Sequence, residues 1–253
     1  MKKQVQAFSL IELLVVMGII GILAGVGLPA IRGIGRANAI TAANRQFQDD
    51  LAFARLRALN ARTTVYLVFA PVVTAGNNLQ PLLDKLTGGT PERRKAELLL
   101  GSQYTSYALI ARRSVGDQPG RETPRYLTEW KTLPEGTLFE TNKLIAKFNA
   151  ALASPYLNGL PTVTLPYPSE RGTPTEMRSF IFNSQGQLVG GRDDVMPIAQ
   201  GSVFFTRDTA GKVRPDLMPD VVMTPAGNWT NNNIRINWVT GRANLERPVN
   251  AFP

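Results

Sequence analysis

Residues 6–17 read QAFSLIELLVVM and begin an apolar run with the carboxylate of Glu12 at its edge. The 19 residues from position 13 to position 31 carry no formal charge. At about 1.5 Å per residue, a helix of this length matches a hydrocarbon core about 30 Å thick. A carboxylate buried in lipid is costly unless a cation pairs with it. The stretch therefore predicts a membrane helix whose acid needs a partner.

We interpret the run as a retained span, in preference to an ordinary cleaved signal peptide. Signal peptides have shorter apolar cores and an A-x-A-like exit, whereas the exit here would be Leu28-Pro29-Ala30. Lysines precede the run and arginines follow it closely, so the positive-inside rule does not orient it.

The composition of the chain narrows the classes of function. Its 253 residues, 43% of them hydrophobic, are enough for one ordinary domain with an appendage. Because the sequence contains neither histidine nor cysteine, histidine-dependent catalysis, thiol chemistry and disulfides are excluded. No nucleotide-binding loop or nucleophile motif is present. We therefore expect no enzyme and no cofactor, with a carboxylate hydrolase as the remaining catalytic alternative.

The chain is strongly basic, with a net charge of +9 and a pI of about 10.1. The positive charges are spread along the sequence and form no single tail. Nucleic acid, anionic lipid and simple solubility all remain open as explanations.

A second helical pattern follows the apolar run. One apolar line has helical spacing, whereas four charged residues lie off it, namely Arg45, Asp49, Arg55 and Arg62. The line comprises Ile40, Phe47, Leu51, Ala54 and Ala58. A continuous helix over residues 8–61 would be about 80 Å long. The alternative is two helices with a hinge at residues 33–35, shortly after Pro29.

The remainder of the chain alternates between predicted strands and loops. Residues 63–69 and 104–113 are predicted strands, separated by a loop with a short helix that begins at Pro91 and is capped by Thr90. Residues 130–140 predict two strands around a Pro-Gly turn, and 141–153 predict a helix. Residues 155–174 predict a loop. Later strands are predicted at 179–183, 187–189, 202–207, 234–239 and 243–246.

The stretch AFSLIELLVVMGIIGILAGVGLPAI resembles the prepilin signal of type IV pilins and type II secretion pseudopilins. The stretch LAFARLRALNARTTVYLVF is similar to FimT and H-type minor pseudopilins. The resemblance implies cleavage by a prepilin peptidase between Ala7 and Phe8, followed by N-methylation of Phe8. Ala7 departs from the family pattern, which has glycine before the cut. Residues 71–170 look like an enlarged insertion, as in pilin-like proteins of bacterial gene cassettes.

The resemblance implies an α+β, pilin-like fold: a long N-terminal helix, with a transmembrane first half, packed on an antiparallel β-sheet domain. The expected divisions are a leader at 1–7, a transmembrane and assembly helix at 8–31, its amphipathic second half at 32–62, and a periplasmic domain at 63–253. The expected location is the inner membrane, single-pass, with the chain joining a filament when assembled. Expected partners are other pilins or pseudopilins, the prepilin peptidase and an inner-membrane assembly platform.

The resemblance also assigns a role to Glu12. Cleavage would create an ammonium group on Phe8, and Glu12 would pair with this amine of a neighbouring subunit. The alternative is an acid that snorkels to the membrane interface. The side chains expected to pack against equivalent helices are Leu10, Leu13, Leu14, Val15, Val16, Ile19, Ile20 and Ile22.

Two further groups of residues each allow a functional and a purely structural interpretation. Arg235, Arg242 and Arg247, near Trp229 and Trp238, would form a cationic, stacking surface for DNA, or else simply face water. FimT-like pilins that bind DNA carry G-R-x-R in this hairpin, whereas this chain reads GRAN from Gly241 to Asn244.

Asp193 and Asp194 would hold calcium, as some pseudopilins do in their C-terminal loops, or form a solvated turn. We predict the turn and no metal.

Overall fold

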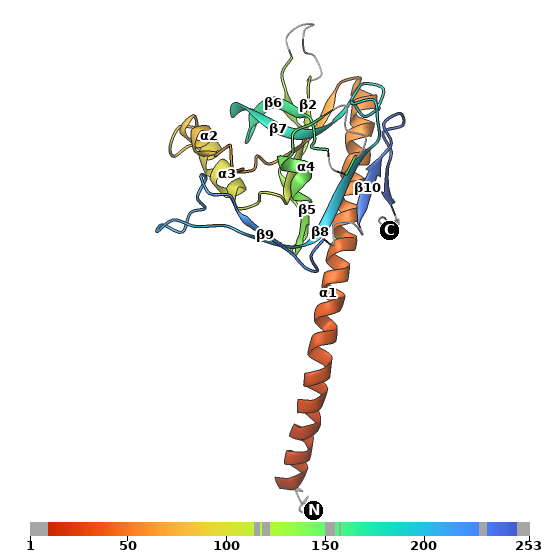
Figure 1. Ribbon diagram of the computed structural model, residues 1–253, viewed down its shortest axis with the longest axis vertical. Coiled ribbons are helices and arrows are strands. Elements are labelled where there is room, and N and C mark those ends of the chain that lie inside the picture. Colours follow the sequence, from red (N-terminus) through yellow and green to blue (C-terminus); the bar gives the residue numbers. More distant parts are fainter. Residues whose placement is uncertain are drawn as a thin grey trace, which may run out of the picture.

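The computed structural model describes residues 10–113, 117, 122–149, 155–156, 158–227 and 232–246, without the side chains of 24–37. Helix α1 (Leu10–Ala61) is one uninterrupted helix whose first half projects from a head that contains both sheets (Figure 1). The continuous helix is therefore confirmed, and the hinge alternative at residues 33–35 is wrong. At about 1.5 Å per residue, its 52 residues extend about 78 Å.

The C-terminal end of α1 is closed by a pair of backbone hydrogen bonds. The Thr63 amide donates to the Ala58 carbonyl at 3.2 Å, and the Arg62 amide donates to the Leu59 carbonyl at 3.4 Å. Arg62 has a φ of 46°, the left-handed conformation that this type of cap requires. The chain thus turns directly from α1 into the first strand.

The first sheet has the strand order β3-β2-β1-β7-β6, with β4 also paired to β2, and its pairings are antiparallel. Its strands are β1 (Val65–Phe69), β2 (Ser106–Ala111), β3 (Arg125–Tyr126), β4 (Lys131–Thr132), β6 (Thr162–Tyr167) and β7 (Thr173–Phe182).

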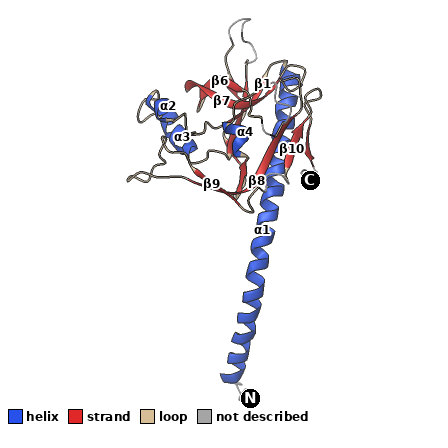
Figure 2. Ribbon diagram, viewed as in Figure 1, coloured by secondary structure: helices blue, strands red, loops and turns tan. Residues whose placement is uncertain are grey.

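The second sheet has the order β11-β10-β8-β5, with β9 also paired to β8, and is likewise antiparallel. Its strands are β5 (Thr137–Phe139), β8 (Asp194–Phe204), β9 (Asp220–Met223), β10 (Asn233–Ile236) and β11 (Ala243–Glu246). Figure 2 shows the strands gathered around the upper half of α1, away from its projecting half.

The main core lies where α1 meets both sheets. The predicted apolar line of α1 is buried, and Phe47 and Leu51 are fully inaccessible to solvent. Val65, Leu67 and Phe69 of β1 enter the same core from the first sheet. Side chains alternate along a strand, so the other β1 side chains point to the opposite face.

That opposite face carries a second core, formed with helices α2 (Gln80–Asp84) and α3 (Pro91–Leu100). Tyr66 and Val68 of β1 pack there. Every residue of β1 is therefore buried, because the sheet is covered on both faces. Residues 71–170 thus supply the cover of this face as well as strands of both sheets.

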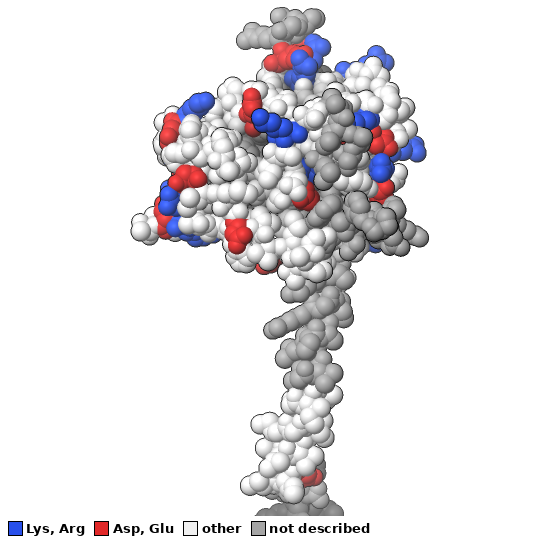
Figure 3. Space-filling model, viewed as in Figure 1, with Lys and Arg blue, Asp and Glu red and all other residues white. Residues whose placement is uncertain are grey.

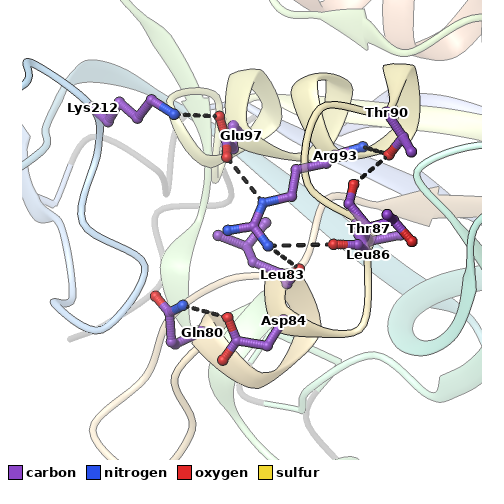
Figure 4. Close-up of polar contacts among 9 residues, drawn as sticks. All are labelled: Gln80, Leu83, Asp84, Leu86, Thr87, Thr90, Arg93, Glu97 and Lys212. Atoms are coloured by element: carbon purple, nitrogen blue, oxygen red, sulfur yellow. Dashed lines mark hydrogen bonds and ion pairs between the residues drawn. The ribbon is translucent and has the colours of Figure 1, made fainter.

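A polar network ties α2 and α3 together (Figure 4). The Arg93 guanidinium donates to the Leu83 carbonyl at 2.6 Å and pairs with Glu97 at 3.1 Å. Thr90 caps α3 by accepting a hydrogen bond from the Arg93 amide, as predicted. Lys212, from the loop between β8 and β9, pairs with Glu97 at 3.0 Å and fastens that loop to α3.

Several predicted elements differ from the structure. The helix expected at 141–153 is the five-residue α4 (Thr141–Ile145), because Ala146 adopts an extended conformation and Arg178 donates to the carbonyls of Leu144 and Ile145. Residues 155–174 contain β6 and the start of β7, so the loop prediction is wrong. The strands around the Pro-Gly turn enter different sheets, and 187–189 forms only an isolated bridge at Leu188.

Candidate functional site

The projecting half of α1 exposes apolar side chains on all sides. Leu10 is 83% exposed and Ile22 is 71% exposed, and the large apolar residues between them are at least half exposed. All of the predicted packing residues lie in this stretch, at Leu10, Leu13, Leu14, Val15, Val16, Ile19, Ile20 and Ile22. A helix that is apolar all round is stable only when lipid or other helices cover it.

Glu12 is the charged residue of this stretch, and it is exposed. In Figure 3 the described lower part of the projecting half of α1 is white except for one acidic group near its N-terminal end. Ala7 and Phe8, the predicted processing residues, lie outside the described residues. Along the sequence, Glu12 lies four positions after Phe8, and in the structure it is the third residue of α1.

A buried polar cluster fixes the second half of α1 to the first sheet. Asp50 accepts hydrogen bonds from the Tyr107 hydroxyl and from the Lys131 ammonium, each at 2.6 Å. The Gln46 amide donates to the same hydroxyl at 3.0 Å. Burial, and then the hydrogen bond to Asp50, raises the pKa of Tyr107 well above its ordinary value of 10.0. This phenol therefore remains a neutral donor, and its hydrogen bonds attach the second half of α1 to β2.

The C-terminal hairpin of β10 and β11 forms as predicted, with Arg235 opposite Asn244. The Arg235 guanidinium is not available as a free cation, because Glu246 accepts from it at 2.8 Å and Asp193 lies at 3.8 Å. The hydrogen bond to Glu246 raises the pKa of Arg235 further. Arg242 is exposed in the turn.

Arg247 and Trp229 fall outside the described residues. Among the described residues of the hairpin, the arginines therefore do not form the array of unpaired cations that the DNA-binding alternative requires.

The predicted aspartate pair is divided between two roles. The Asp193 carboxylate accepts from the Trp238 amide at 3.0 Å, whereas Asp194 pairs at 2.6 Å with Lys143. Within the described residues, no group of three candidate metal ligands occurs. Asp194 therefore belongs to a buried ion pair, which the sequence did not predict.

The Lys143 ammonium is fully buried and also donates to the carbonyls of Pro155 and Asn158 at 2.8 and 2.9 Å. Burial lowers the pKa of Lys143 and raises that of Asp194, in each case against the attraction of the partner. The pair joins α4 to the start of β8. No local signal marks it, because the two residues are 51 positions apart.

Residues 2–28 match the family described as the prokaryotic N-terminal methylation motif. The chain is type IV pilin-like. It joins this motif to a long helix packed on antiparallel sheets in an α+β fold. The matched range includes Ala7, Phe8 and Glu12, whose roles in processing and assembly remain predictions.

No curated protein matches the chain. A solved structure of the type IV minor pilin FimU from Pseudomonas aeruginosa aligns over 84% of this chain and 91% of its own, with 12% identity and a TM-score of 0.34. Among helices built from the described residues, none qualifies by length and apolarity as a membrane crossing.

Proposed function

We propose that this chain is a minor pilin or pseudopilin subunit that assembles through the projecting half of α1. The filament is a type II secretion pseudopilus or a type IV pilus-like fibre. The observation that carries the proposal is the apolar stretch of α1 at residues 10–23, which is exposed on all sides and lies within the methylation motif. The protein acts by packing with other pilins, and it catalyses no reaction.

The physical argument is that this surface requires a cover. Burying one large aliphatic side chain contributes about 1.5–3 kcal/mol, and the stretch holds many of them. Before assembly, the membrane supplies the cover, with residues 8–31 in the inner membrane and the head in the periplasm. In the filament, equivalent helices supply it. Prepilin peptidase and an inner-membrane platform are the partners in this transfer.

In this proposal, Glu12 sets the register between subunits. Cleavage between Ala7 and Phe8 frees an α-ammonium four positions before Glu12. Within one α-helix the two groups lie on the same side, but the proposed pair joins neighbouring subunits. In a medium of low dielectric, this pairing offsets the cost of burying both charges.

Mass spectrometry of the full chain, co-expressed with a prepilin peptidase, tests the first step. We expect a mature chain that begins with methylated Phe8, and an Ala7→Gly variant that is cleaved at the same place. An intact Met1, or a terminus beyond Ala24, would contradict the proposal.

Filament incorporation tests the second step. Glu12→Gln is expected to be cleaved normally but to enter filaments poorly, whereas Glu12→Asp retains part of the incorporation because it keeps the charge. Glu135→Gln, which neutralises an exposed acid of the head, is the matched control. Equal incorporation of Glu12→Gln and the control would show that no ion pair sets the register.

A further inference from the structure

A basic hollow of about 260 Å³ lies at the end of α1 farthest from the N-terminus. Its cationic lining comes from three elements: Arg57 from α1, Arg113 from just beyond β2, and Arg125 from β3. We call it the arginine pocket. From Glu12 to Arg57, α1 rises about 68 Å, so the pocket is remote from the proposed assembly surface.

Strand register brings these arginines to one side of the sheet. Ala111 pairs with Val65 on one neighbour and with Arg125 on the other. Arg113 lies two residues beyond Ala111, past the end of β2, and lines the same hollow as Ala111 and Arg125. This side of the sheet is the one covered by α1, since Val65 and Ala111 belong to the α1 core. Ala111 itself lines the hollow, and its side chain is small.

The charges of this hollow lack partners. Within the part of the chain that the structure describes, no side-chain hydrogen bond or ion pair engages Arg57, Arg113 or Arg125, and no carboxylate is among the lining residues. By contrast, the neighbouring Arg112 is paired with Glu122. Like charges that share a hollow repel one another, so an anion bound between them is stabilised by all three.

The floor of the pocket adds a further polar group. Thr63 follows the end of α1 and is only 6% exposed, and its hydroxyl has no hydrogen-bond partner among the described residues. Thr63 is one of the lining residues. A buried hydroxyl without a partner costs free energy, so Thr63 is an unsatisfied polar group beside the arginines. In Figure 3 both basic and acidic side chains lie at this distal end of the head.

We propose that the arginine pocket binds a phosphate dianion, either inorganic phosphate or a phosphate monoester. Guanidinium groups form paired hydrogen bonds with phosphate oxygens, and three of them suit a group with two negative charges and three or four free oxygens. A phosphodiester strand carries one charge per phosphate and spreads these charges along a groove, whereas three arginines around one hollow of about 260 Å³ favour the doubly charged monoester. The site does not depend on filament assembly, and failure of either proposal would leave the other standing.

Calorimetric titration of the full chain in detergent, in a low-salt buffer without phosphate, tests the proposal. The titrants are inorganic phosphate, phenyl phosphate and an oligothymidylate without terminal phosphate. We expect one saturable site for the first two, with a Kd at or below about 1 mM, that weakens as salt is added. Binding of the oligonucleotide through these arginines, with no binding of the two monoester-type titrants, would overturn the proposal.

Variants assign the binding to the pocket. Arg57→Gln and Arg113→Gln should each weaken phosphate binding about tenfold or more, because each removes a charge-assisted contact. Arg45→Gln is the matched control, since Arg45 is an exposed arginine of the same helix outside the pocket. The Tm of the two pocket variants without phosphate should equal that of the wild type, because they remove no contact. Unchanged affinity in both, or no saturable binding to the wild type, would refute the assignment.

Discussion

Phe47 lies where α1 meets both sheets, and its removal is the most direct test of how the head is held together. The side chain is fully buried. Its ring centroid is 5.0 Å from that of Phe139 in the second sheet, and 5.3, 6.2 and 6.5 Å from those of Tyr107, Phe69 and Phe180 in the first. Phe47 therefore contacts three elements of one sheet and one of the other.

The expected cost of Phe47→Ala follows from these contacts. Replacing a buried phenylalanine by alanine costs about 3–5 kcal/mol in lost burial and in the cavity that remains. Because the neighbouring rings belong to different sheets, they cannot close the cavity together, so we expect a value near the upper end of that range. For a protein of this size, such a loss lowers the Tm by about 6–20 °C.

The measurement is urea unfolding of the full chain in detergent, followed by near-ultraviolet circular dichroism of the aromatic cluster. Phe53→Ala is the control, because Phe53 lies on the same helix but is 40% exposed, and it should cost less than about 1 kcal/mol. A Phe47→Ala loss no greater than that of Phe53→Ala would refute the view that this ring joins the two sheets. Unchanged slopes of the unfolding curves would confirm that the variants differ in stability alone.

Two further predictions concern buried and paired charges. Asp194→Ala should lower the free energy of unfolding by about 3–5 kcal/mol, because it leaves the Lys143 ammonium buried without its carboxylate. In urea unfolding, the double variant Lys143→Met, Asp194→Leu should recover at least half of that loss. No recovery would contradict the ion-pair argument. The hydrogen bond from Lys212 is the largest cause that lowers the pKa of Glu97 below its ordinary value of 4.5. The ionised Glu97 therefore stabilises the fold above its ordinary pKa, and this stabilisation is lost as the pH falls through the lowered pKa of the folded protein. Between neutral and acidic pH, the free energy of unfolding should thus fall less for Glu97→Gln than for the wild type. An identical fall in both proteins would count against this interaction.

The sequence by itself determined the features that rest on local periodicity. The spacing of Phe47, Leu51 and their neighbours predicted the buried face of α1, because residues on one side of a helix recur at fixed intervals. The alternation in residues 63–69 predicted β1, and Thr90 before Pro91 predicted the start of α3, because caps and strands depend on adjacent residues. The apolar run with Glu12 at its edge predicted the first part of α1, which the structure shows as helix from Leu10.

Tertiary structure decided what depends on residues distant in sequence. The strands on either side of the Pro-Gly turn separate into two sheets, because β2 and β8 offer them different partners. The helix after position 141 stops after five residues, because Arg178 from β7 takes up its terminal carbonyls. The Lys143–Asp194 pair and the arginine pocket likewise join separate elements. Such contacts follow from strand register and packing, which no local pattern of residue types encodes.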